Sequence, residues 1–236
     1  MSPEPAYQPP HVDWGLRARE LDAAGFSVLP ALLSVDECAA LRDSYEAPAR
    51  FRSRVVMARH GFGRGEYQYF SYPLPPLLQA LRSALYPPLA AIANRWSEQL
   101  RRDTRYPPEH AAYLARCHEA GQLRPTPLLL RYGPHDYNCL HQDLYGPHVF
   151  PLQLTVLLSK PGEEFEGGEF VLTAGDADER RAEVVPLAQG DAVVFAVNER
   201  PVPGRRGMRR AVTRHGVSVV RSGRRFTVGL IFHDAP

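Results

Sequence analysis

The stretch Arg210–His233, RAVTRHGVSVVRSGRRFTVGLIFH, contains the pattern that decides the fold. Two runs rich in β-branched and apolar residues flank Arg221-Ser222-Gly223, which is typical of a β-hairpin whose three-residue loop ends in a left-handed glycine. Pairing across such a loop, combined with the alternation of side chains along strands, puts Arg225 and Thr227 on the same face as His215. We therefore expect an imidazole and a guanidinium to share one wall of a sheet.

A second extended run carries His141-Gln142-Asp143. Because residues two apart on a strand point the same way, the imidazole and the carboxylate act together, and His215 supplies a second imidazole. Such a set occupies one face of an octahedral metal ion and leaves other positions open, which suits non-haem Fe(II). Iron enzymes of this kind use a dicarboxylate co-substrate whose far carboxylate needs a fixed cation, and Arg225 is the candidate.

Two other features compete for the role of metal ligand. His11-Val12-Asp13 repeats the His-x-Asp spacing, but it lies in a proline-rich segment before a helical pattern, so we interpret it as a leader and helix cap. Cys139 precedes His141 by two residues and is a candidate thiolate ligand. We expect instead that Cys139 is buried and packs as a small hydrophobic side chain.

The sequence changes character near Gly121, with helical patterns before it and short strand patterns after it. The predicted helices are 16–24, one starting at Ser34 with Glu37 completing a capping box, 77–86, 88–102 and 107–120. The predicted strands are 126–132, 137–141, 149–159, 169–173, 182–186, 192–197, 210–220 and 225–233. We expect an α+β fold in one folded unit: a helical region, 1–121, packing on a double-stranded β-helix or jelly roll, 122–236.

Composition excludes several classes of protein. A net charge of +2 is too small for a general polyelectrolyte binder, and no apolar run is long enough to cross a membrane. Three cysteines without CxxC spacing fit a reducing compartment, so we expect a cytoplasmic protein. Nine arginines lie between Arg200 and Arg225 with no acid among them, which indicates either a phosphate-binding surface or a solvated loop.

One segment of the first part fits neither pattern. Phe51–Phe70 mixes an extended-looking run with glycines and aromatic residues. It is either a mobile flap over an active-site mouth or an irregular loop held to the core by its aromatic side chains.

The motifs together resemble those of a known superfamily. His141-x-Asp143 followed by HGVSVVRSGRR (215–225) resembles the Fe(II)/2-oxoglutarate-dependent dioxygenases, in particular their prolyl-hydroxylase-like branch, and FEGGEF (165–170) is similar to a Gly-Gly-Glu motif of that branch. Further stretches, TPLLLRY (126–132) and LHQDLYG (140–146), resemble a bacterial family described as oxygenases acting on damaged DNA. The superfamily resemblance covers roughly residues 125–233.

This resemblance implies that His141, Asp143 and His215 bind Fe(II) and that Arg225 pairs with the far carboxylate of 2-oxoglutarate. It makes Tyr132 and Thr227 secondary candidates for co-substrate binding, and no other catalytic residue is implied. Dioxygen is the second co-substrate, and decarboxylation to succinate is coupled to hydroxylation or oxidative demethylation of a primary substrate. The remaining histidines considered, His135, His148 and His233, we expect at the surface or behind the ligands, and Gln142 we expect to be structural.

The sequence leaves two other functions open. A cupin-like metal enzyme working without 2-oxoglutarate has no use for Arg225, and a non-catalytic ligand-binding module has no use for three convergent ligands. The primary substrate is undecided among damaged nucleic acid, a protein side chain and a small molecule, because no recognition helix or nucleic-acid motif is evident.

Overall fold

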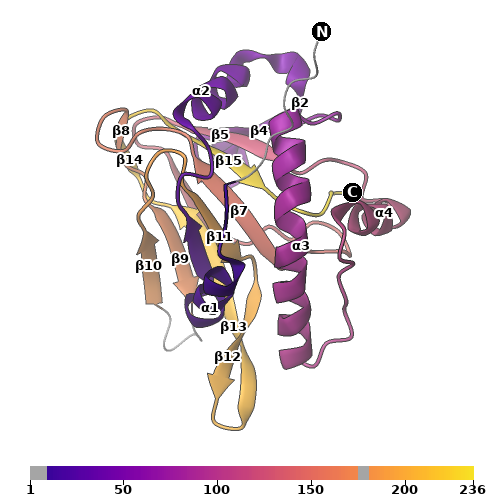
Figure 1. Ribbon diagram of the computed structural model, residues 1–236. Helices are drawn as coiled ribbons and strands as arrows, with labels where there is room; N and C mark the ends of the chain where they lie inside the picture. The colour runs from indigo at the N-terminus through magenta and orange to yellow at the C-terminus, as the bar shows by residue number, and fades with distance from the viewer. Residues whose placement is uncertain (1–9, 175–180) are drawn as a thin grey trace.

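The computed structural model describes residues 10–174 and 181–236, and it contains two packed β-sheets with helices on one side (Figure 1). The larger sheet has the strand order β1 (Phe26–Leu29), β11 (Ala192–Ala196), β7 (Leu152–Leu157), β15 (Arg225–Leu230), β5 (Leu128–Tyr132), β4 (Glu66–Phe70) and β2 (Phe51–Val56). The smaller sheet has the order β10 (Arg181–Val185), β9 (Phe170–Ala174), β13 (Gly207–Val217), β6 (Tyr137–His141) and β3 (Gly63–Arg64). The predicted jelly roll is confirmed, and each of the eight predicted strands has a counterpart.

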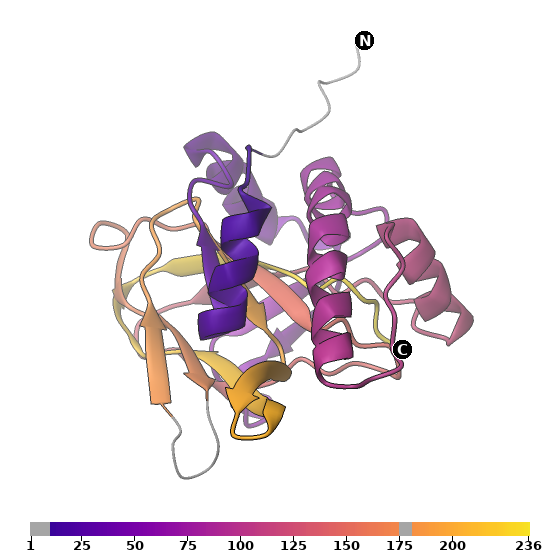
Figure 2. The same ribbon diagram turned by 60° about the horizontal axis from the view of Figure 1, so that its bottom comes forward.

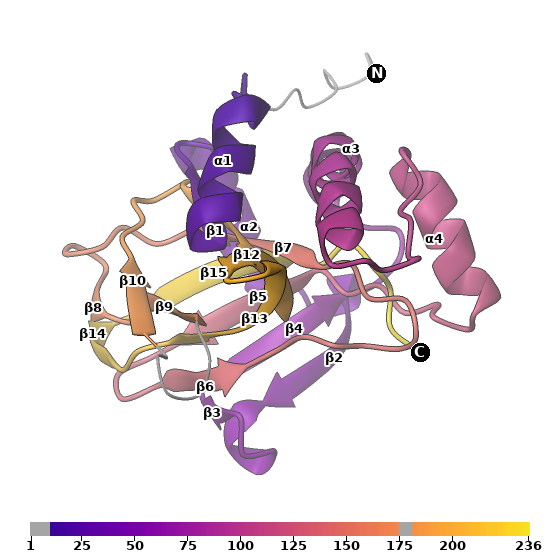
Figure 3. The same ribbon diagram turned by 90° about the horizontal axis from the view of Figure 1, so that it is seen from below.

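Three further strands lie outside these two paths. β12 (Glu199–Gly204) pairs with β13 to form a projecting hairpin, and β14 (Val220–Gly223) pairs with β8 (Phe165–Gly167). The helices are α1 (Trp14–Ala24), α2 (Val35–Asp43), α3 (Pro76–Gln99) and α4 (His110–Glu119). Seen from below, α1, α3 and α4 lie on one side of the larger sheet and the smaller sheet lies on the other (Figure 3). Within the described ranges, no helix combines the length and apolarity needed to span a membrane.

Because side chains alternate along the central strands, one face of the larger sheet contacts the hydrophobic core and the other face lines a cavity. In β7, Leu152, Leu154 and Val156 belong to the main hydrophobic core that the helices share, whereas Gln153 and Thr155 line a cavity between the sheets. The helices therefore close the apolar face of the larger sheet and leave its polar face for chemistry.

Two predictions about the helices have clear outcomes. Asp13 is the N-cap of α1 and accepts a hydrogen bond from Leu16 N at 3.0 Å, so its role as a cap is confirmed, and Ser34 and Glu37 form the predicted capping box of α2. The predicted break between residues 86 and 88 is wrong, because α3 continues through Pro87 and Pro88. Pro87 is exposed and Pro88 is half-buried, and residues 83 and 84, whose carbonyls lose their helical partners, are exposed to solvent.

The predicted hairpin between the last two long strands is also wrong. β13 pairs with β6, β9 and β12, whereas β15 pairs with β5 and β7, and Val220 is opposite Gly167 instead of Arg224. The chain leaves the smaller sheet after β13, pairs with β8, and enters the larger sheet. Gly167 and Gly223 permit this crossing, because both have positive φ and a Cβ at either would overlap a backbone carbonyl.

The first 121 residues contain strands as well as helices, so the helical description of this region is incomplete. β1 forms one edge of the larger sheet, and the segment Phe51–Phe70 supplies β2, β3 and β4. That segment is not an irregular loop, because β2 and β4 form a hairpin that extends the larger sheet beside β5, and Phe62 in the connection between them lines the cavity.

A buried ion pair connects α3 to the end of the chain. Arg82 and Asp234 are both fully buried, and Arg82 Nη2 donates to Asp234 Oδ1 at 2.8 Å. Arg82 also donates to the carbonyls of Ile231 and His233, and Tyr72 donates to the second carboxylate oxygen. Removing one partner of such a pair leaves the other charge buried without compensation.

We expect Arg82→Met to lower the free energy of unfolding by about 3–5 kcal/mol, measured by urea denaturation. The control is Arg95→Met, because Arg95 pairs with Asp22 at 2.8 Å where both side chains are about two-fifths exposed, and there we expect a loss below about 1 kcal/mol. Equal losses in the two variants would show that the buried network does not stabilise the C-terminal segment.

Candidate metal centre

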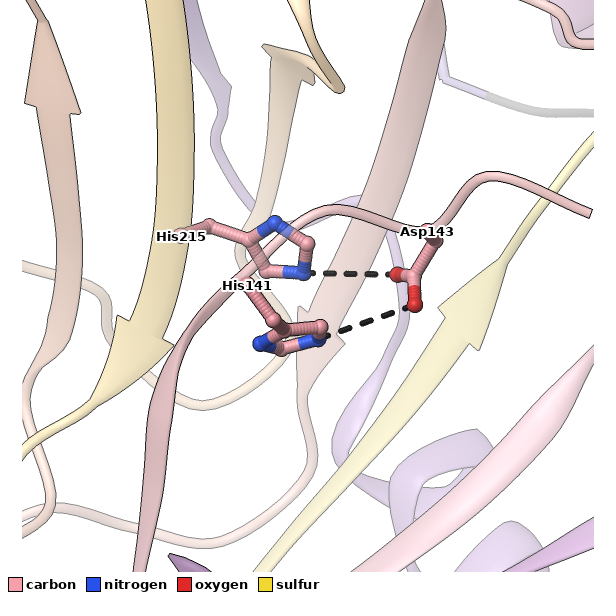
Figure 4. A group of neighbouring side chains, drawn as sticks. All are labelled: His141, Asp143 and His215. Carbon is pink, nitrogen blue, oxygen red and sulfur yellow. Dashed lines mark ion pairs between the residues drawn. The ribbon is translucent and has the colours of Figure 1, made fainter. Parts of the chain in front are cut away.

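The fold brings together the three side chains expected to bind metal. His141 is the last residue of β6, and it pairs directly with His215 of β13, so the two imidazoles emerge side by side from neighbouring strands. Asp143 follows β6 by two residues and turns its carboxylate toward both rings (Figure 4). One ligand atom from each residue lies within 4.8 Å of the others.

The separations within this cluster fit an ion-binding site better than a set of direct hydrogen bonds. His215 Nε2 is 3.4 Å from Asp143 Oδ2, and His141 Nε2 is 3.6 Å from Asp143 Oδ1. N–H···O hydrogen bonds usually span about 2.7–3.2 Å. The three groups therefore converge without satisfying one another.

The protonation states suit metal binding. Burial opposes the ionisation of Asp143, but the neighbouring imidazoles of His215 and His141 outweigh it, so the pKa of Asp143 lies well below its ordinary value. Burial lowers the pKa of His215, which favours the neutral imidazole. Nδ1 of His141 lies 2.8 Å from the carbonyl of Cys139, to which it donates, and this leaves the Nε2 lone pair directed at the cluster. A carboxylate and two imidazole nitrogens fit a divalent metal ion.

Two tyrosines hold the carboxylate from behind. Tyr145 donates from its hydroxyl to Asp143 Oδ1 at 2.8 Å, and Tyr69 donates to the Tyr145 hydroxyl at 3.1 Å. Both tyrosines were missed by sequence reasoning. Tyr145 lies within the quoted LHQDLYG motif two residues after Asp143, which was the available signal, whereas Tyr69 belongs to the unassigned segment.

Arg225 lies in the same cavity as the cluster but on the facing sheet. It is 1% exposed, and its Nε and Nη1 atoms have no hydrogen-bond partner among the described residues. Burial lowers the pKa of Arg225 to about 10. Tyr132 is its cross-strand neighbour, with the guanidinium carbon 5.5 Å from the ring centre, and the Tyr132 hydroxyl also lacks a partner. A buried cation with open donors indicates a site for an anion.

The cavity between the two sheets is about 230 Å³. The imidazoles lie on the smaller sheet, whereas Arg225 and Thr227 lie on the larger one, so the expectation of a single shared wall is corrected to two facing walls. Much of the lining is aromatic: Phe62, Tyr67, Tyr69, Tyr132, Phe170 and Phe195.

Comparison with known proteins identifies the family. The family model described as "Oxygenase, catalysing oxidative methylation of damaged DNA", Oxygenase-NA, matches residues 65–235. The chain belongs to the Oxygenase-NA family. A relative from Mycobacterium tuberculosis, the uncharacterized protein Rv2227, is 42% identical over 198 residues, which cover 82% of this chain and 85% of the relative.

Solved structures share the fold of this Oxygenase-NA protein. An oxidoreductase of the 2OG-Fe(II) oxygenase family from Burkholderia pseudomallei is 17% identical, with a TM-score of 0.55 over 97% of this chain and 95% of that one. A prolyl-4-hydroxylase from Pseudomonas putida is 17% identical, with a TM-score of 0.52 over 94% and 99%. Together with the family and the His–Asp–His cluster, this fold identifies a non-haem Fe(II)- and 2-oxoglutarate-dependent dioxygenase, as the sequence predicted. The cupin-like and binding-module alternatives are set aside.

The other predicted residues of the Oxygenase-NA chain lie outside the cluster. Cys139 is exposed, so the prediction of a buried residue is wrong; it lies where the pairing of β6 with β13 is irregular, between Asn138 and His141. Gln142 donates to Asn198 and to the Thr213 carbonyl, which agrees with a structural role. His233 is fully buried and its Nδ1 accepts from Phe150 N at 3.2 Å.

Proposed function

We propose that His141, Asp143 and His215 are the Fe(II) ligands of this oxygenase and that Arg225 binds the far carboxylate of 2-oxoglutarate. The observation that carries this proposal is the buried guanidinium with open donors in the cavity that also holds the three converging ligand atoms. Bound iron supplies the activation of dioxygen that oxidises 2-oxoglutarate and the primary substrate. All other tasks fall to the chain itself.

The two facing sheets divide these tasks. The proposed ligands at the end of β6, just after it and on β13 would hold the metal at one end of the co-substrate, and Arg225 on β15 would hold the other end through charge-assisted hydrogen bonds. Thr227 and the free hydroxyl of Tyr132 are secondary contacts for the same carboxylate, since both line the cavity on that side. The aromatic lining excludes water and strengthens these electrostatic contacts.

The Tyr145 hydroxyl positions Asp143 by occupying one carboxylate oxygen and leaving Oδ2 directed at the ligand cluster. We expect Tyr145→Phe to weaken metal binding by about 10–100-fold, because the carboxylate loses its orienting donor. Titration with Mn(II) under anaerobic conditions measures this without turnover. Tyr137→Phe, on the same strand as His141, is the control and should leave the affinity unchanged. Unchanged Mn(II) affinity in Tyr145→Phe would remove the positioning role.

For the primary substrate we propose a base of damaged DNA. The family description supports this class, and the aromatic lining suits a planar ring that has been taken out of its stack. A protein side chain or a small molecule is the competing class. We also propose a cytoplasmic location, which the three free cysteines, one of them exposed, support.

The test is substrate-stimulated formation of succinate from 2-oxoglutarate by the Fe(II)-loaded chain. Methylated single-stranded and duplex oligonucleotides, unmodified oligonucleotides, peptides and a metabolite extract are compared at equal mass concentration. We expect stimulation by methylated oligonucleotides only, with one succinate formed per base altered. Stimulation by peptides or metabolites alone would assign the enzyme to the competing substrate class.

A further inference from the structure

The β12–β13 hairpin projects from the body of the molecule (Figures 1 and 2). Its strands pair from Glu199↔Val212 to Gly204↔Gly207, so Arg205 and Arg206 form a two-residue turn at the tip. Arg209 and Arg210 follow on the returning strand, and all four side chains are exposed. Glu199 is the only acid between residues 199 and 214, and it lies at the base of the hairpin, where it pairs with Arg102 and with Arg210. Arg205 and Arg206 therefore place two positive charges at the tip, at least six residues from the nearest acid in the sequence.

The base of the hairpin is fixed to the core. Arg200 is 7% exposed, and it donates to the carbonyls of Asp22 and Ala23 at the end of α1. Thr213 Oγ1 lies within hydrogen-bonding distance of the carbonyls of Ala196, at 2.8 Å, and Asn198, at 2.9 Å. A surface loop that served only solubility would need no such anchoring.

The same strand links the tip to the metal centre. β13 starts at Gly207 beside the turn and carries His215 eight residues later. At about 3.3 Å per residue the tip lies about 26 Å along the strand from the ligand cluster. This distance is set by a paired strand, so the basic tip and the site keep a constant spacing.

We propose that the β12–β13 hairpin binds the phosphate backbone of the nucleic acid whose base enters the cavity. Arginine suits this role because its planar guanidinium matches the phosphate oxygens, and a two-stranded ribbon is narrow enough to follow a groove of the duplex. At about 3.4 Å per nucleotide along one strand, a spacing of about 26 Å corresponds to roughly eight nucleotides between the altered base and the contacted phosphates. This inference rests on the proposed nucleic-acid substrate and adds where its backbone is held.

Binding is measured by fluorescence anisotropy with the full chain, loaded with Mn(II) and without 2-oxoglutarate, so that the result does not depend on turnover. The probes are labelled DNA oligonucleotides of 4 and 20 nucleotides, titrated at several salt concentrations. The variant is Arg205→Gln/Arg206→Gln. The control, Arg19→Gln/Arg101→Gln, removes the same charge from exposed positions on α1 and after α3.

For the 20-nucleotide probe we expect the hairpin variant to bind about tenfold more weakly and to lose between one and two units of the slope of log K against log salt. The 4-nucleotide probe is too short to reach both places, so the unaltered chain should bind it much more weakly than the 20-nucleotide probe. Equal weakening in the control variant would overturn the proposal, as would equal affinity of the unaltered chain for the two probes. Competition by polyglutamate as strong as that by DNA would assign the hairpin to an acidic protein instead.

The two proposals fail in different ways. If DNA binding depends on the hairpin but DNA does not stimulate succinate formation, the proposed substrate is wrong and the hairpin assignment stands. If methylated DNA stimulates succinate formation but the hairpin variant binds DNA normally, the proposed substrate stands and the hairpin assignment is wrong.

Discussion

Asp143→Ala is expected to abolish the coupled formation of succinate, with a loss on the order of 1,000-fold or more, because residues that act as one unit fail together. Asp143 supplies the only carboxylate of the candidate ligand set, and the two imidazoles that remain do not balance the charge of a divalent ion. Iron content after anaerobic loading should fall well below one per chain. The measurements are succinate formation and metal analysis of the desalted protein.

Two further variants separate loss of metal from loss of folding. Asp143→Asn keeps the shape of the side chain, so it should remain folded and still lose iron. Asp103→Ala makes the same chemical change at an exposed position and should keep both iron and turnover. One tightly bound iron per chain in Asp143→Asn, with normal turnover, would remove this residue from the ligand set.

Arg225→Met is expected to raise the dissociation constant of 2-oxoglutarate by at least about 100-fold while leaving metal binding nearly intact. Charge-assisted contacts from a buried guanidinium contribute about 3 kcal/mol, and each 1.4 kcal/mol is about tenfold in affinity. The neighbouring exposed Arg224 offers the matched control, since Arg224→Met removes an equal charge outside the cavity. Isothermal titration of the Mn(II)-loaded chain measures both affinities.

The same substitution should affect stability in two opposite ways. Without co-substrate, Arg225→Met should melt no lower than the unaltered chain, because a buried charge without a partner is removed. With saturating 2-oxoglutarate, the unaltered chain gains stability through ligand binding, whereas the variant does not. A normal rise in melting temperature of Arg225→Met on adding 2-oxoglutarate would contradict the assignment of Arg225 as the carboxylate anchor.

The sequence correctly predicted that His141, Asp143 and His215 lie together, but it predicted the wrong strand pairing for the segment that carries Arg225. His141 and Asp143 depend on a local spacing of two residues, and local spacing can be read from sequence. His215 and Arg225 were expected on one wall because a glycine loop between two runs favours a hairpin. In the structure that glycine serves the close approach of β14 to β8, a long-range contact that no local pattern encodes.

The elements missed by sequence reasoning share a physical cause. Residues 83 and 84 of α3, whose carbonyls lose their partners to Pro87 and Pro88, are exposed, so water can replace the lost hydrogen bonds and these prolines do not end the helix. In β4 the polar Gln68 is buried because neighbouring elements cover it, and it donates to the carbonyl of Tyr45. Tertiary contacts determined these elements, and propensity alone did not.

The passage of the chain from the smaller sheet to the larger one, between His215 and Arg225, has a consequence for molecular length. Because the proposed iron ligands lie on one layer and the proposed anchor on the other, the gap between the layers would set the length of the diacid that bridges them. A homologue one methylene shorter, oxaloacetate, or one longer, 2-oxoadipate, has its terminal charge misplaced by roughly one carbon–carbon bond, and it must forfeit either chelation or the guanidinium.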